Sequence, residues 1–82
     1  MLFTEKNLGQ ILRNMYDNAP HNERVVMIHL FGIKYGDIIE NRNFKVADII
    51  REAGLYESYS REVFKGINLG KYVQIKPEKD TF

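Results

Sequence analysis

Apolar residues in the first part of the chain recur at the spacing of one face of a helix. Leu8, Ile11, Leu12 and Met15 stand at positions i, i+3, i+4 and i+7, which is the pattern of an amphipathic α-helix with one buried side. Thr4 precedes this pattern and is a good N-cap residue. The polar run DNAPHN follows it and contains a proline, so we expect the first helix to end there.

A second and broader apolar pattern runs from Asn22 to Glu40. Its width predicts a helix that contacts neighbours on two sides. Gly32 and Gly36 lie within it, four residues apart, where they would share one side of a helix. Two interpretations stay open: a continuous helix that a neighbour approaches closely at the glycines, or a break near Gly32.

The third predicted helix follows the polar turn ENRN. Val46, Ile49, Ile50 and Ala53 share one face, and Gly54 stands where a helix commonly ends in the left-handed conformation. The sequence therefore predicts a short helix with a glycine C-cap.

The fourth predicted helix runs from Glu57 to Lys65 and ends at Gly66. The segment KYVQIK after it alternates weakly and is expected to be a short extended segment or strand. Residues 77–82 have the composition of a flexible tail. The expected core consists of Leu8, Ile11, Leu12, Met15, Ile28, Phe31, Tyr35, Ile38, Ile49, Ile50, Leu55, Val63 and Phe64.

Length and composition narrow the class of protein. Eighty-two residues, 44% of them hydrophobic and 28% charged, suit one globular domain over residues 1–76. The chain has no cysteine, which fits a cytoplasmic protein and leaves no thiol for a metal or a nucleophile. No signal peptide or membrane-spanning run is evident. No catalytic arrangement, phosphate loop or metal-ligand spacing is evident either, so we expect no enzyme, cofactor, metal or small-molecule substrate.

The segment 45–66 has the layout of a helix-turn-helix motif. Gly54 can adopt the positive φ that a tight turn needs, and Leu55 can pin the turn to the core. The stretch VADIIREAGLYESYSREVFKGIN resembles the helix-turn-helix of phage repressors of the lambda type. The whole chain is also similar to a small bacterial family of helix-turn-helix-like domains. These resemblances imply DNA binding, often as a dimer on a symmetric site.

Three positions depart from the repressor pattern. Tyr56 stands where a capping Ser or Thr is usual, Ser60 where an apolar residue is usual, and Ile50 where Ala is usual. Ser58 could act as the cap instead and start the helix later. The alternative for Gly54 and Leu55 is an ordinary helix end between two core helices.

Charge is the weak point of a DNA-binding interpretation, because the net charge is only +1 and DNA-binding domains usually carry a basic excess. The basic residues concentrate between Arg42 and Lys76, a segment that contains seven basic and four acidic residues. Candidate DNA contacts are Lys45, Ser58, Ser60, Arg61, Lys65 and Lys71. The alternative is that these side chains only form a solvated surface.

The sequence thus predicts an all-α, four-helix helix-turn-helix domain with a short extended C-terminal segment. The leading functional hypothesis is binding of double-stranded DNA, in transcription regulation or a DNA-processing system of a bacterium or phage. The alternative is a protein–protein interaction or assembly module that makes no contact with DNA. A homodimer, formed through the second helix or through KYVQIK, or a larger complex, fits either hypothesis.

Overall fold

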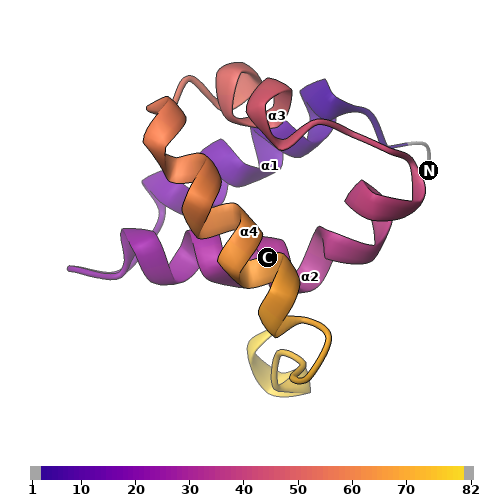
Figure 1. The fold of residues 1–82 in the computed structure, drawn as a ribbon. Helices are drawn as coiled ribbons and strands as arrows, with labels where there is room; N and C mark the ends of the chain where they lie inside the picture. The colour runs from indigo at the N-terminus through magenta and orange to yellow at the C-terminus, as the bar shows by residue number, and fades with distance from the viewer. Residues whose placement is uncertain (1–2, 81–82) are drawn as a thin grey trace.

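The computed structural model describes residues 3–80 and contains four α-helices and two short 3-10 turns (Figure 1). No strand is formed within these residues. The predicted all-α, four-helix class is therefore confirmed. The elements in chain order are α1 (Glu5–Asp17), α2 (Arg24–Asn41), α3 (Val46–Ala53), η1 (Glu57–Tyr59), α4 (Ser60–Leu69) and η2 (Pro77–Lys79).

The helices pack as two main pairs, α1 against α3 and α2 against α4, and α1 also contacts α2. Figure 1 shows α4 lying across α2, and α3 lies beyond the N-terminal end of α4. Apolar side chains from all four helices meet between the pairs and form one continuous core. The buried hydrophobic residues are Leu8, Leu12, Met15, Ile28, Phe31, Tyr35, Ile39, Val46, Ile49, Ile50, Ala53, Val63 and Ile67.

The start of α1 is a capping box. The Asn7 backbone N–H donates to the Thr4 hydroxyl at 3.0 Å, and the Thr4 N–H donates to the Asn7 side chain at 3.0 Å. This reciprocal pair satisfies two backbone donors that a helix start would otherwise leave unpaired. The predicted Thr4 cap is confirmed.

The second helix is continuous through both of its glycines, so the interpretation with a break near Gly32 is wrong. It begins later than expected, because Asn22 has a φ of 62° and does not cap it. Glu23 takes the cap position without a side-chain hydrogen bond. The apolar packing on two sides of α2 therefore stabilises it more than its N-terminal cap does.

The backbones of α2 and α4 meet at Gly32 and Gly66. A Cβ atom at Gly32 would lie 2.5 Å from the Val63 carbonyl oxygen and 2.8 Å from the Gly66 Cα. A Cβ atom at Gly66 would collide with the His29 carbonyl. Only glycine at both positions permits this approach. Gly66 therefore lies inside α4, and the prediction that it ends the helix is wrong.

The turn after α3 is a Schellman motif. Gly54 has a φ of 70°, and its N–H donates to the Arg51 carbonyl at 3.0 Å. The Leu55 N–H reaches back to the Ile50 carbonyl at 3.2 Å, and Leu55 packs at the edge of the core. These two bonds satisfy carbonyls that the helix end leaves free. The predicted left-handed glycine is confirmed.

Other expectations about packing need correction. Phe64 was expected in the core but is 52% exposed, because Val63 and Ile67 occupy the buried side of α4. Ile11, Ile38 and Leu55 are only partly buried against the core. Ser58 does not cap a helix, since neither η1 nor α4 has a side-chain cap.

The segment after α4 also differs from expectation. Lys71 and Tyr72 form a turn, and the residues from 73 to 76 are irregular instead of forming a strand. In the predicted tail 77–82, Pro77–Lys79 is a 3-10 turn, and Asp80 pairs with Lys34 of α2 at 2.7 Å. Residues 81 and 82 lie outside the described part.

Candidate interaction face

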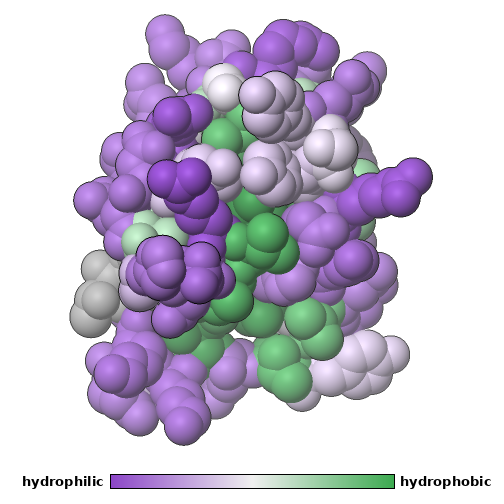
Figure 2. Space-filling view, turned by 90° about the vertical axis from the view of Figure 1, so that its left-hand side faces the viewer, coloured by the Kyte–Doolittle hydropathy of each residue, from purple (hydrophilic) through white to green (hydrophobic). Residues whose placement is uncertain are grey.

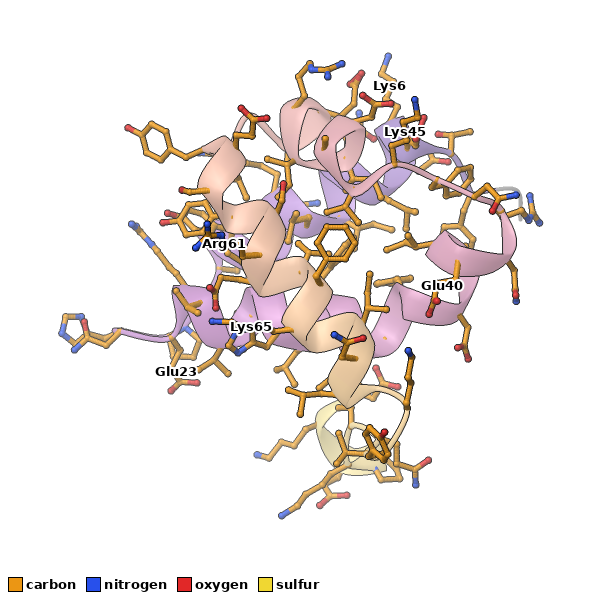
Figure 3. All side chains as sticks on the ribbon, in the orientation of Figure 1. Lys6, Glu23, Glu40, Lys45, Arg61 and Lys65 are labelled. Carbon is orange, nitrogen blue, oxygen red and sulfur yellow. The ribbon has the colours of Figure 1, made fainter. Side chains whose placement is uncertain are left out.

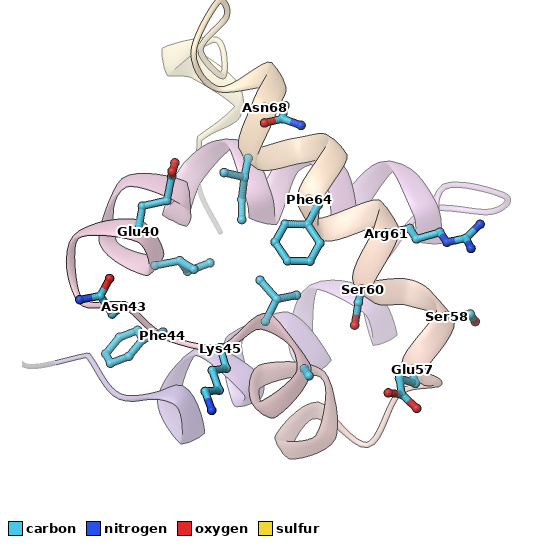
Figure 4. Close-up of a pocket in the computed structure, with 14 residues that line it drawn as sticks. Glu40, Asn43, Phe44, Lys45, Glu57, Ser58, Ser60, Arg61, Phe64 and Asn68 are labelled. Carbon is cyan, nitrogen blue, oxygen red and sulfur yellow. The ribbon is translucent and has the colours of Figure 1, made fainter.

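An open groove lies between α4, the C-terminal end of α2 and the start of α3 (Figure 4). The groove is open because α4 and α3 contact each other sparsely. Its apolar part comes from all three helices and from the loop between α2 and α3. These residues are Ile39, Phe44, Val46, Ala47, Phe64 and Ile67.

Phe64 stands in the middle of this groove and is the chief exposed aromatic there (Figure 4). Phe44 on the opposite side is partly buried against the core. The exposed side of α4 carries Arg61, Phe64 and Asn68, which stand at i, i+3 and i+7. The outward face of the helix is therefore part apolar and part polar.

Charged side chains surround the groove. Glu40, Lys45, Glu57 and Arg61 line it and are exposed. Among residues 3–80, none of the four takes part in an ion pair. The groove thus has two acids and two bases on its rim, with no excess of positive charge.

The predicted contact residues do not form one cluster. Lys45, Ser58 and Arg61 line the groove and are exposed. Ser60 lines it as well, but its Oγ is buried and has no hydrogen-bond partner in the described part of the chain. An outward-facing Ser60 hydroxyl was expected, and this placement removes it from direct contact with a partner.

The other two predicted contacts lie elsewhere. Lys65 borders a different surface hollow, formed with His29, Leu69 and Tyr72. Lys71 lies in the turn after α4 and borders a third hollow. Figure 3 shows Arg61 and Lys65 on α4, away from Lys45 near the start of α3.

Lys65 is already engaged within the chain. Its Nζ lies 3.2 Å from Glu62, and the same carboxylate accepts a hydrogen bond from His29 Nε2 at 2.7 Å. Hydrogen bonds from His29 and then from Lys65 lower the pKa of Glu62. This cluster links α2 to α4, so it supports the fold beside the groove.

Sequence reasoning did not name most of the groove residues as contacts, among them Glu40, Phe44, Glu57 and Phe64. The spacing of Arg61, Phe64 and Asn68, at i, i+3 and i+7, was the available signal that Phe64 lies on the outward face of the helix. Phe64 was assigned to the core because a large aromatic residue is usually buried. The apolar pattern of the fourth helix includes both Val63 and Phe64, and it did not show which of the two faces inward.

A second apolar feature occupies another face. Figure 2 shows a strip of hydrophobic residues running down that face between hydrophilic ones. Aliphatic side chains that are about two-fifths or more exposed are Val25 and Val26 at the start of α2, and Leu69 and Val73 at and after the end of α4. The groove around Phe64 carries charges of both signs around its apolar centre.

The described residues contain no group of three or more histidine, aspartate or glutamate side chains able to hold a metal. No helix in this part of the chain is long and apolar enough to cross a bilayer.

Comparison with protein families gives one match, to a family described as HTH-like domain, over residues 4–76. Comparisons with curated proteins and with solved structures give no match. The family model covers all four helices and the Gly54 turn.

Proposed function

We propose that this chain, which belongs to the HTH-like domain family, is a non-enzymatic protein–protein interaction module. Membership of this family leaves the bound partner open. The contact surface of the module is the groove around Phe64. The observation that carries this proposal is the half-exposed Phe64 in the middle of the outward face of α4. In a helix-turn-helix protein that reads DNA, this face enters the major groove.

The chemistry of the face supports a protein partner. Interfaces between proteins are enriched in aromatic residues at a central apolar patch and have a polar rim. Phe64 and the floor residues form such a patch, and four exposed charges surround it. A DNA backbone would instead meet Glu40 and Glu57 together with Lys45 and Arg61, and the two acids would oppose phosphate.

Double-stranded DNA is the second candidate, because the helix-turn-helix shape is widely used to bind it. Arg61 makes no ion pair among residues 3–80, and Ser58 and Asn68 are exposed near it. These three side chains offer donors to base edges. Such binding would weaken steeply as salt is raised. An unchanged duplex affinity after Arg61→Ala combined with Lys65→Ala would remove α4 as the reading helix.

Photo-crosslinking from position 64 separates the two candidates. A photoreactive phenylalanine derivative at position 64 lies on the face that both candidates use, so its adduct identifies the partner class. We expect an adduct in cells that nuclease leaves intact and whose mass exceeds that of the chain by the mass of a second polypeptide. The matched control is the same derivative in place of Tyr56, which is 80% exposed and outside the groove. A nuclease-sensitive adduct at position 64 would establish DNA instead.

A further inference from the structure

The rim charges of the groove are arranged in opposite order on its two sides. Figure 4 shows Glu40 and Lys45 on one side of Phe64, and Arg61 and Glu57 on the other. Glu40 and Arg61 lie toward one end of the groove, and Lys45 and Glu57 lie toward the other. Figure 3 agrees in showing Arg61 on the side opposite Glu40 and Lys45.

From this arrangement we infer that the groove is an interface between two copies of this chain. In a symmetric dimer the same surface serves both subunits, and residue i of one contacts residue j of the other. A two-fold axis that runs along the groove past Phe64 exchanges its two sides. Glu40 of each copy then faces Arg61 of the other, and Lys45 of each faces Glu57 of the other. Each acid on the rim meets a base, and no like charges meet.

The unpaired state of these four residues supports the same arrangement. Three other basic side chains of α1, α3 and α4 are paired with an acid of the same helix, in Arg13–Asp17, Arg51–Asp48 and Lys65–Glu62. The rim charges of the groove have no such partner among the described residues. A second copy supplies one for each of them.

The apolar centre provides the driving force for this contact. With the axis past Phe64, the two phenylalanine rings lie near each other and each covers the floor of the opposite groove. Phe64 is 52% exposed, so its burial removes roughly half of the about 150–250 Å² that a whole aromatic side chain buries. Central aromatic residues dominate the energy of interfaces. The rim pairs then select this orientation over others, since exposed ion pairs contribute more to specificity than to affinity.

This inference rests on the proposed function and names its partner as a second copy of the chain. It uses the C-terminal end of the second helix, through Glu40, together with α4. It does not use the segment 71–76, the other surface that the sequence analysis considered for dimerisation. It also has a consequence for nucleic acid. A dimer closed over α4 covers Arg61 and leaves no outward face of that helix to enter a major groove.

Sedimentation equilibrium of the purified chain tests the inference. We expect the chain to dimerise and Phe64→Ala to abolish the dimer. Either single reversal, Glu40→Arg or Arg61→Glu, should weaken the dimer by about tenfold or more, because it creates two like-charge contacts per dimer. A mixture of the two single variants should recover wild-type affinity, because both rim contacts are then between opposite charges. Glu52→Arg, an exposed reversal on α3 outside the groove, is the matched control and should change nothing.

The outcomes separate this inference from the proposed function. A chain that stays monomeric to about 1 mM, or single variants that do not rescue each other, would overturn the two-fold arrangement. If position 64 then cross-links in cells to a protein other than this chain, the interaction module stands and only the partner is wrong. If it cross-links to nucleic acid alone, both proposals fall. Circular dichroism of each variant distinguishes a lost contact from a lost fold.

Discussion

Glu62 is the side chain that most directly ties α4 to α2 through charge. Its carboxylate accepts from His29 Nε2 at 2.7 Å and lies 3.2 Å from Lys65 Nζ. Both contacts favour the ionised carboxylate, first the hydrogen bond from His29, and they hold the pKa of Glu62 below its ordinary value. A group with a lowered folded pKa stabilises the protein while it is ionised and loses that contribution on protonation.

The expected result is an acid-sensitive part of the stability curve that depends on Glu62. The free energy of unfolding should fall as the pH drops below the ordinary glutamate pKa of about 4.3 and through the lower folded value. Glu62→Gln should be less stable than wild type at neutral pH and should show a shallower fall. Urea unfolding measured across pH checks this.

The control for that comparison is Glu52→Gln. Glu52 is exposed and has no ion pair among residues 3–80, so its amide variant should keep the wild-type slope. Parallel curves for wild type and Glu62→Gln would show that the cluster contributes nothing to acid stability.

Two glycines of α2 that look equivalent in the sequence have different roles in the packing of helices. A Cβ atom at Gly32 would lie 2.5 Å from backbone of α4, whereas one at Gly36 would make ordinary contacts of 3.4 Å with Ile67. The first position permits the helix crossing. The second has room for a methyl group, so glycine there only weakens the helix.

Substitution by alanine at these positions should therefore have opposite effects. Gly36→Ala should raise the free energy of unfolding by up to about 1 kcal/mol, the difference in helix propensity. Gly32→Ala should lower it by roughly 1–3 kcal/mol, because backbone must move to relieve the overlap. Thermal or urea unfolding of the two variants measures the difference. Equal effects would mean that α2 and α4 do not meet at Gly32.

At the level of elements, local signals predicted well and long-range contacts did not. The Thr4 cap, the stop before α2 and the Gly54 turn rest on neighbours within a few residues, and all three are found. Gly66 was misread as the end of a helix. Glycine is needed there because the backbone contacts Gly32, 34 residues earlier in the chain. KYVQIK alternates weakly, but no other strand is available among the described residues to pair with it.

The molecule as a whole keeps the residues that hold it together apart from those that form the groove. Val63 is fully buried, and its neighbour Phe64 is 52% exposed. Phe64→Ala should therefore cost under about 1 kcal/mol of folding free energy in dilute solution. Val63→Ala should cost about 2 kcal/mol, because it leaves a cavity in the core. Urea unfolding at low protein concentration checks the pair.

A loss for Phe64→Ala as large as that for Val63→Ala would contradict this division. It would mean that the exposed ring supports the fold, and the groove would then be a packing defect instead of a contact surface.

The candidate site could be predicted only in part, because the groove is formed by segments that the fold brings together. Lys45, Ser58 and Arg61 were named from the sequence and do line the groove. Glu40 and Phe44 could not be named, because only the path of the chain between α2 and α3 brings them opposite α4. The charge count in the sequence warned against a simple DNA-binding surface, but it could not show how acids and bases alternate around Phe64.

The contact between Gly32 and Gly66 also affects what a partner would lose in entropy on binding. One wall of the groove is α4 and the other includes the end of α2, and these helices touch backbone to backbone at Gly32 and Gly66. The groove is therefore already in its bound shape before a partner arrives. Only rim side chains such as Arg61 and Lys45 need to be ordered, at about 0.5–1.5 kcal/mol each. A small chain with a thin core can in this way present a preorganised surface without any moving loop.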